Sequence, residues 1–148
     1  PNFLEVIKNF GSSAYGEIYS LSFRMFLDNP ITGIGINNFK FLCNYNELYK
    51  NMMVNYECAS HPHNIYIQWL VEGGLIVFFL FILYLSFLVK FIFSNTGDKK
   101  YKIISLIIIL IMFWPIMSTG SLVKNWFGVT TFFIIGLCMC LSKFKNSN

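Results

Sequence analysis

The chain has 148 residues, of which 55% are hydrophobic, 19% aromatic and 12% charged, and its mean hydropathy is +0.57. Soluble domains carry about 25% charged residues, so the composition indicates a membrane protein and excludes an ordinary soluble domain. The net charge of +4 comes from ten lysines and a single arginine, Arg24. No basic stretch alternates with aromatic residues on a polar scaffold, which argues against nucleic acid as a partner.

The chain starts at Pro1, with no initiator Met and no basic leader. This start predicts the C-terminal portion of a longer polytopic protein rather than a chain with a signal peptide. Because upstream helices would then be missing from the site, we expect this portion to be inactive alone.

The first predicted helix runs to about Asp28, with Ser12 or Ser13 as its cap. It should end at Asn29, because a proline disfavours a helical residue before it. An apolar face is predicted from residues that recur at steps of three and four: Tyr15, Ile18, Tyr19, Phe23 and Phe26.

A turn-rich corner, Asn29-Pro30-Ile31-Thr32-Gly33-Ile34-Gly35, follows this helix. Its two glycines permit backbone dihedrals that are closed to other residues. Residues 38–56 have no sustained period and predict an ordered surface loop, with one short helix around 47–53.

Three apolar runs follow, at Leu75–Phe93, Ile103–Met117 and Trp126–Leu141. Nineteen helical residues span about 28 Å, close to the roughly 30 Å of a hydrocarbon core. The expected fold is therefore all-α: a polytopic membrane protein with a helical loop at 1–73 and three transmembrane helices at 74–148.

Lysines predict the orientation of these helices. With three helices threaded up and down, two basic clusters flank the same side: Lys90, Lys99, Lys100 and Lys102, then Lys143 and Lys145. The positive-inside rule places that side in the cytoplasm. Residues 1–73 are then expected to face the periplasm or the cell exterior.

The four cysteines fall into two pairs. Cys138 and Cys140 lie in an apolar run and read as small hydrophobic residues. Cys43 and Cys58 lie in a polar segment without CxxC spacing, which argues against zinc. Outside the cytoplasm these two could either form a disulfide or remain free thiols.

The stretch Ser60–Gly74, SHPHNIYIQWLVEGG, holds both histidines and leads into the first apolar run. Pro62 suits the first turn of a helix, with Ser60 or His61 as the cap. A helix that starts there puts His61 and His63 about 200° apart. It also gives one polar face: His61, Asn64, Gln68 and Glu72.

Three interpretations of this polar face remain open. It is either a site at the membrane boundary, where ionisable groups are typically functional, or a wetted helix entrance anchored by Tyr66 and Trp69. Zinc on His61 and His63 is the third, weakened because no acidic or cysteine partner is nearby. Glu72 favours a site, since a carboxylate at this depth needs a partner, and Arg24 is a candidate partner.

Taken together and in this order, Arg24, the corner at 29–35, the run HPHNIYIQ at 61–68 and Glu72-Gly73-Gly74 resemble the O-antigen ligase and O-antigen polymerase superfamily. The resemblance covers about Ser20–Leu80. Ile67 stands where leucine is usual, and Val77 where a further glycine is common; both departures leave the polar positions intact.

The resemblance implies a glycosyltransferase of the bacterial inner membrane that needs no cofactor or metal. The donor is a glycan on undecaprenyl diphosphate, and the acceptor is another glycan or the lipid A core. His63 matches the H-N position of the family, which implies that it acts as the base. Arg24 matches the family's arginine, which implies that it holds and neutralises the departing diphosphate. His61, Asn64, Gln68 and Glu72 are then candidates to bind or orient substrate.

The sequence does not separate polymerase from ligase. The rival class is a non-catalytic membrane subunit or a transporter component of an envelope polysaccharide system. The three apolar runs contain almost no ionisable groups, which argues against transport of ions or protons.

Overall fold

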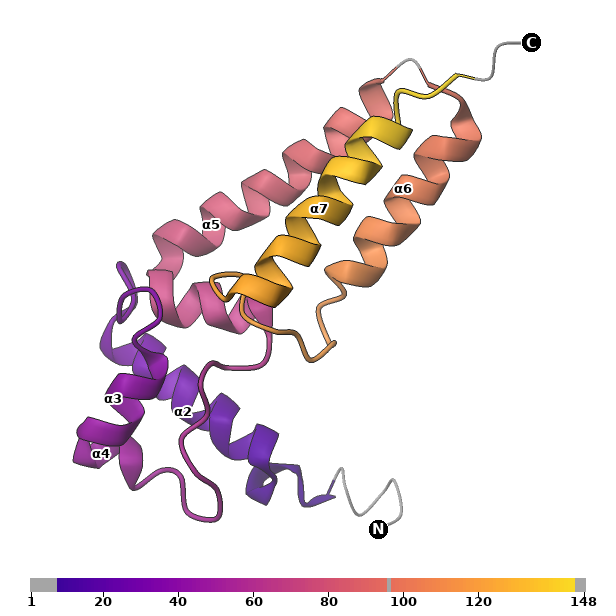
Figure 1. Ribbon diagram of the computed structural model, residues 1–148. Coiled ribbons are helices and arrows are strands. Elements are labelled where there is room, and N and C mark those ends of the chain that lie inside the picture. Colours follow the sequence, from indigo (N-terminus) through magenta and orange to yellow (C-terminus); the bar gives the residue numbers. More distant parts are fainter. Residues whose placement is uncertain (1–7, 96, 146–148) are drawn as a thin grey trace. The chain divides into compact units, whose positions relative to one another are not determined.

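The computed structural model describes residues 8–95 and 97–145, and it is all-helical in those ranges (Figure 1). The chain divides into two compact units, Pro1–Phe78 and Phe79–Asn148. The elements in chain order are η1 (Phe10–Ser12), α2 (Ala14–Asp28), α3 (Phe39–Tyr45), α4 (Glu47–Lys50), α5 (Ile65–Ser94), α6 (Lys99–Met112) and α7 (Asn125–Leu141).

Helix α2 begins and ends where its sequence signals predict. The Oγ of Ser13 accepts a hydrogen bond from the Gly16 N–H at 3.1 Å, which satisfies a donor left open at the helix N-terminus. Asn29 is the C-terminal cap. Both predicted boundaries are confirmed.

The predicted apolar face of α2 is wrong in part. Phe23 is 60% exposed, and the side buried in the first unit is Ile18, Leu21, Ser22 and Met25. These residues follow the same helical period as the predicted set, shifted round the helix. Aromatic residues dominated the sequence pattern, whereas the flanking segments pack on the aliphatic side.

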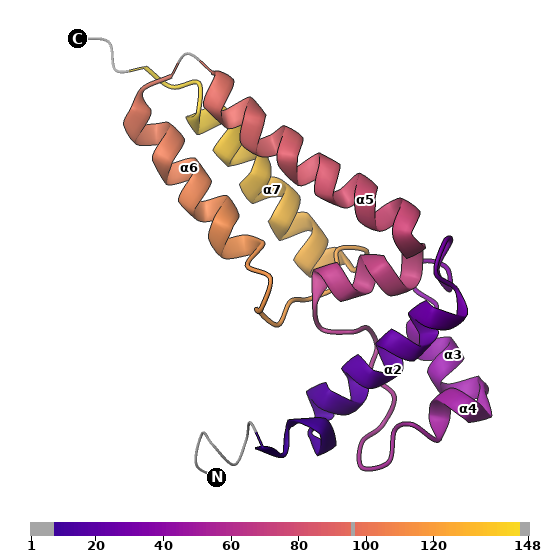
Figure 2. The ribbon, with the colours of Figure 1, turned by 180° about the vertical axis from the view of Figure 1, so that it is seen from behind.

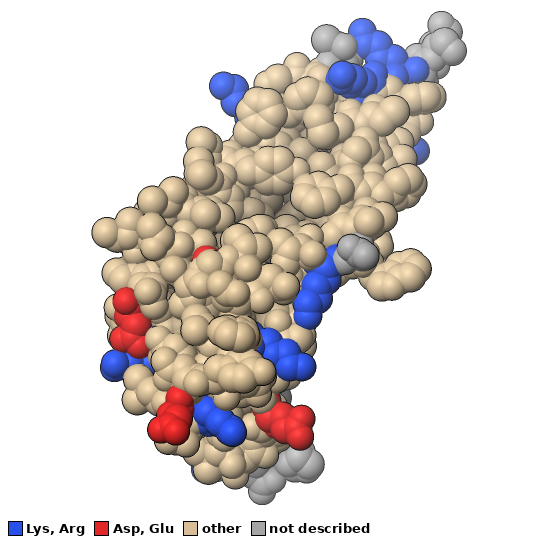
Figure 3. All heavy atoms as spheres, turned by 60° about the vertical axis from the view of Figure 1, so that its left-hand side comes forward, with Lys and Arg blue, Asp and Glu red and all other residues tan. Residues whose placement is uncertain are grey.

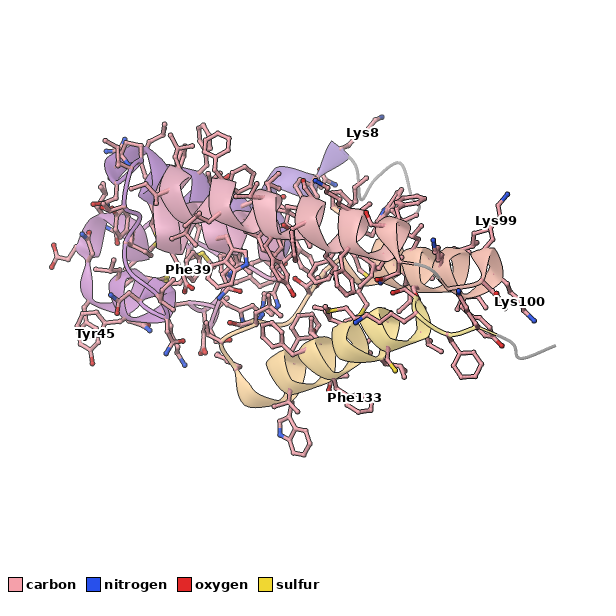
Figure 4. The ribbon with its side chains drawn as sticks, turned by 90° about the horizontal axis from the view of Figure 1, so that it is seen from above. Lys8, Phe39, Tyr45, Lys99, Lys100 and Phe133 are labelled. Atoms are coloured by element: carbon pink, nitrogen blue, oxygen red, sulfur yellow. A yellow bond between two sulfur atoms is a disulfide. The ribbon has the colours of Figure 1, made fainter. Side chains whose placement is uncertain are left out.

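The first unit is built around a small core that α2 shares with α3, α4 and the start of α5. Its buried members are Ile18, Leu21, Met25, Phe39, Cys43, Tyr49 and Val71. Figure 4 shows Phe39 directed inward and Tyr45 outward from α3. The sequence had predicted a loop here with one short helix, so α3 is an addition to the prediction.

Helix α5 is the described helix that is long and apolar enough to cross a membrane. It breaks at Gly74, where φ is 64° and ψ is −167°. Only 17% of its most apolar stretch is buried within the chain, unlike the core helix of a soluble protein. The part after the break, Leu75–Ser94, spans about 30 Å, the thickness of a hydrocarbon core.

In the second unit the later part of α5 runs beside α6 and α7 (Figures 1 and 2). Ser105 on α6 donates a hydrogen bond to the Cys138 carbonyl on α7 at 3.0 Å. Phe133 points away from the helices (Figure 4) and is 71% exposed. This apolar outer face suits lipid.

Helix α6 stops at Met112 instead of running to Met117 with a bend, because Pro115 cannot continue the helical hydrogen bonds. The 14 residues of α6 and the 17 of α7 span about 21 and 26 Å, less than a bilayer core. The all-α class is thus confirmed for the described residues. The number of membrane crossings stays a prediction.

Both basic clusters of the second unit lie at one end of it. The Asp98 N–H donates to the Phe144 carbonyl at 2.9 Å, and the Asn95 amide donates to the Ser142 hydroxyl at 2.7 Å. These bonds join the turn before α6 to the segment after α7. Figure 3 shows a cluster of blue side chains at this end and separate blue side chains elsewhere on the molecule.

Candidate functional site

The two histidines precede helix α5 and are not part of it. The helix begins at Ile65, and Asn64 caps it: its Oδ1 accepts hydrogen bonds from the N–H groups of Tyr66 and Ile67 at 3.0 and 3.1 Å. The predicted start at Pro62 is therefore wrong. Asparagine is among the favoured residues at this position, because its side-chain oxygen accepts from the first free N–H groups of the helix.

The turn before the helix brings the two histidine rings together. His63 has a left-handed backbone, with φ of 56°, and the rings of His61 and His63 have centroids 4.2 Å apart. This corrects the separation of about 200° that continuous helical geometry had predicted. The Ser60 hydroxyl lies 2.9 Å from Nδ1 of His61, so a neighbouring side chain orients that ring.

Tyr15, near the start of α2, completes this cluster. Its ring meets the His63 ring edge-on at 6.1 Å between centroids. His61 is 9% exposed and His63 is half-buried, so His63 is the more accessible imidazole. The spacing of Tyr15 predicts only a place on the apolar face of α2, so its contact with His63 is a finding of the structure.

The polar face of α5 is satisfied internally. The Gln68 amide donates to the Glu72 carboxylate at 2.9 Å, one turn along the helix, and both side chains are only 1% exposed. Asn64 uses its side-chain oxygen in the cap. These three residues are thus engaged in holding the start of α5.

Arg24 lies towards the other end of α2. Its Nη2 is 3.1 Å from Oδ1 of Asp28, and its Nε donates to Oδ2 of the same carboxylate at 3.1 Å. The nine residue steps from Tyr15 to Arg24 correspond to about 13.5 Å along α2 and half a turn round it. The structure thus joins Tyr15 to the histidines and leaves Arg24 with Asp28, not with Glu72.

Tyr49 extends the arginine pair into the core. Its hydroxyl donates to Oδ2 of Asp28 at 2.9 Å. Burial raises the pKa of the Tyr49 phenol, and the Asp28 carboxylate raises it further, because both favour the neutral form. The Asp28 carboxylate therefore contacts both side chains: it pairs with Arg24 and accepts the hydrogen bond of the Tyr49 hydroxyl.

The glycine corner packs directly into the break of α5. The Ile34 and Gly35 N–H groups donate to the Val71 and Glu72 carbonyls at 3.0 and 2.9 Å. In return, the N–H of Leu75 donates to the Pro30 carbonyl at 2.9 Å. We call this exchange between residues 30–35 and 71–76 the glycine junction.

The glycine junction leaves no room for side chains at its centre. Gly33 and Gly74 both have positive φ, 68° and 64°. A Cβ at Gly33 would overlap the Glu72 backbone, and one at Gly74 would overlap the Ile31 carbonyl. The predicted conformational role of Gly33 is confirmed, and its physical reason is this close approach to α5.

A disulfide joins Cys43 of α3 to Cys58 of the following loop, which settles the open choice between bridge and free thiols. Cys138 and Cys140 are free. Within the described residues no group of three or more histidine, cysteine or acidic side chains is placed to hold a metal ion.

The described residues are helical and include one helix of membrane length, which breaks at the glycine junction. Residues 6–82 match the O-antigen ligase family, which is more than half of the chain, so the protein belongs to that family. Its role therefore lies in glycan processing at a bacterial membrane. Neither the curated proteins nor the solved structures include a significant match.

Proposed function

We propose that this protein acts in glycosyl transfer from an undecaprenyl-diphosphate-linked glycan to a sugar hydroxyl, on the outer side of the bacterial inner membrane. The acceptor is a second lipid-linked glycan or the lipid A core. One observation carries the proposal: in a chain of the O-antigen ligase family, His61 and His63 meet at 4.2 Å just before the membrane-length helix. The donor's lipid tail stays in the bilayer, so its reacting carbon must remain near such an entrance.

In the proposed step the acceptor oxygen attacks the anomeric carbon, forming the new glycosidic bond. The bond from that carbon to the diphosphate oxygen breaks, and the lipid diphosphate leaves with the electron pair. His63 takes the proton of the acceptor hydroxyl, a role suited to imidazole near neutral pH. His61, against the His63 ring and beside the Ser60 hydroxyl, orients the base.

Arg24 is proposed to neutralise the leaving diphosphate. Its planar fork already makes two contacts to one carboxylate, the geometry that also suits phosphate oxygens. This role requires diphosphate to replace Asp28 as its partner, or the donor to extend along α2. Arg24 is half-exposed, which leaves its guanidinium open to such an exchange.

The test is transfer by membranes that contain each variant in the full-length protein, with a purified lipid-linked donor and normal protein levels. We expect His63→Ala to lower transfer by about 10²- to 10⁴-fold, the typical contribution of a general base. His61→Ala should have a smaller effect. Arg24→Ala should abolish transfer and Arg24→Lys should be severely impaired, whereas Lys8→Ala, at an exposed position, serves as the charge control.

Unchanged transfer in His63→Ala would overturn the base assignment. Full activity of Arg24→Lys would show that Arg24 acts through its positive charge and not through the two-pronged geometry of its guanidinium. If cells need the protein for surface glycan but all residues tested are dispensable in transfer, the chain is the non-catalytic subunit of the rival class.

A further inference from the structure

The first unit carries a polar hollow away from the histidine pair. It has a volume of about 500 Å³, within the range of about 300–1,000 Å³ that is typical of small-ligand sites. Lys40 and Asn44 of α3, Lys50 of α4, and Tyr56 and Glu57 of the following loop line it.

The charge of the hollow favours an anion. Two lysines and one glutamate leave a net charge of +1 among its lining side chains. Among the residues that the structure describes, neither Lys40 nor Lys50 forms an ion pair with a carboxylate. Both ammonium groups are therefore available to a ligand carboxylate or phosphate.

The remaining lining groups favour a sugar. The Asn44 amide donates to the Lys40 carbonyl at 2.9 Å, which fixes the side chain and leaves its oxygen to accept from a ligand hydroxyl. Tyr56 is 46% exposed and offers both a ring face and a hydroxyl. A free phosphate ion would use the lysines but not these two groups.

Three long-range ties hold the walls of the hollow in place. The Cys43–Cys58 disulfide joins α3 to the loop. The Glu17 carboxylate accepts from the Asn55 backbone at 3.2 Å and from its side-chain amide at 2.6 Å, and Tyr49 anchors α4 to Asp28. A site held by its scaffold loses less entropy on binding.

We propose that this hollow binds a sugar unit that carries a carboxylate or a phosphate. Its contacts are the ammonium groups of Lys40 and Lys50 for the anion, with Asn44 and Tyr56 for the hydroxyls and the ring. The inference rests on the proposed function in one respect: the sugar belongs to the glycan being assembled. Glu57 opposes the same anion and limits the affinity.

The test is a titration of the purified full chain in detergent micelles, followed by the backbone amide NMR signals of residues 40–58. The probes are methyl glucuronide, glucose 6-phosphate, methyl glucoside and inorganic phosphate, at one ionic strength. We expect the first two to bind and shift these signals, and the neutral glucoside and phosphate alone to bind at least about threefold more weakly.

Removing a lysine and removing the glutamate should change the affinity of the hollow in opposite directions. Lys40→Gln and Lys50→Gln should each weaken the binding of methyl glucuronide by about two- to fivefold, the range of an exposed charge pair. Glu57→Gln should tighten it by a similar factor, and Lys8→Gln, outside the hollow, should leave it unchanged. Tightening by Glu57→Gln separates a local charge effect from damage to the fold.

Equal binding of phosphate and glucose 6-phosphate would overturn the sugar assignment. Absence of shifts, or identical affinities in the lysine variants and wild type, would overturn the site. Because binding is measured without transfer, loss of this inference leaves the proposed glycosyl transfer standing. Binding of glucuronide together with absence of transfer by the full-length protein would instead refute the proposed function alone.

Discussion

At the scale of single residues, the turn at residues 61–64 explains how two histidines come to face each other. Side chains two residues apart diverge in a helix, but the left-handed backbone of His63 takes residues 61–63 out of helical geometry. Histidine is among the non-glycine residues that tolerate this region. Asn64 then starts the helix, so the turn and the cap act together.

Substitutions of Asn64 test whether this residue acts mainly as the cap of α5. If its main role is the cap, Asn64→Ser should preserve most of the stability, because serine is a comparable cap residue. Asn64→Ala should lower the free energy of unfolding by about 1 kcal/mol. Thermal unfolding in detergent, followed by circular dichroism, measures both. Equal destabilisation by Ser and Ala would mean that the amide N–H groups of Asn64 matter more than the cap.

At the scale of elements, the glycine junction connects two motifs that lie about forty residues apart in the chain. A helix broken in an apolar stretch exposes N–H and C=O groups that lipid cannot satisfy. Here the corner supplies both donors and acceptors to the two broken ends. The corner and the Glu-Gly-Gly run therefore form one structural device that sets where the membrane-length part of α5 begins.

The junction predicts a clear contrast between glycines. Gly33→Ala and Gly74→Ala should each destabilise the fold by about 2 kcal/mol, because both add a Cβ at positive φ and against backbone. Gly136→Ala is the matched control, since a Cβ there meets nothing within 4 Å and alanine favours a helix. Thermal unfolding compares them. Unfolding temperatures of the two junction variants equal to that of Gly136→Ala would contradict the proposed close packing.

Local signals in the sequence predicted local structure well. Ser13 and Pro30 gave the bounds of α2 because caps and prolines act within a few residues, and the apolar length after Gly74 gave the later part of α5. The start of α5 was missed because Pro62 is an equally good start signal and nothing marks His63 as left-handed. The contact of Tyr15 with His63 and the backbone bonds of the junction arise from tertiary folding, so no periodicity encodes them.

At the scale of the whole molecule, two independent features bear on orientation. The Cys43–Cys58 bridge in the first unit belongs in an oxidising compartment. Most lysines of the second unit lie at the end where α5 ends, and Lys124 alone lies in the turn before α7. The positive-inside rule assigns the lysine-rich end to the cytoplasm. If α5 crosses the bilayer, both features give the same orientation, with the first unit outside the cytoplasm.

Labelling of single cysteines tests this orientation. Lys8 and Lys99 project into solvent from the two units (Figure 4), so each is a site for an engineered thiol. With Cys138→Ala and Cys140→Ser as background, the native disulfide stays and the new thiol is the one free cysteine. We expect an impermeant maleimide to label Lys8→Cys in intact spheroplasts and Lys99→Cys only after the membrane is permeabilised. Labelling of Lys99→Cys in intact cells would reverse the orientation and exclude a site on the outer side.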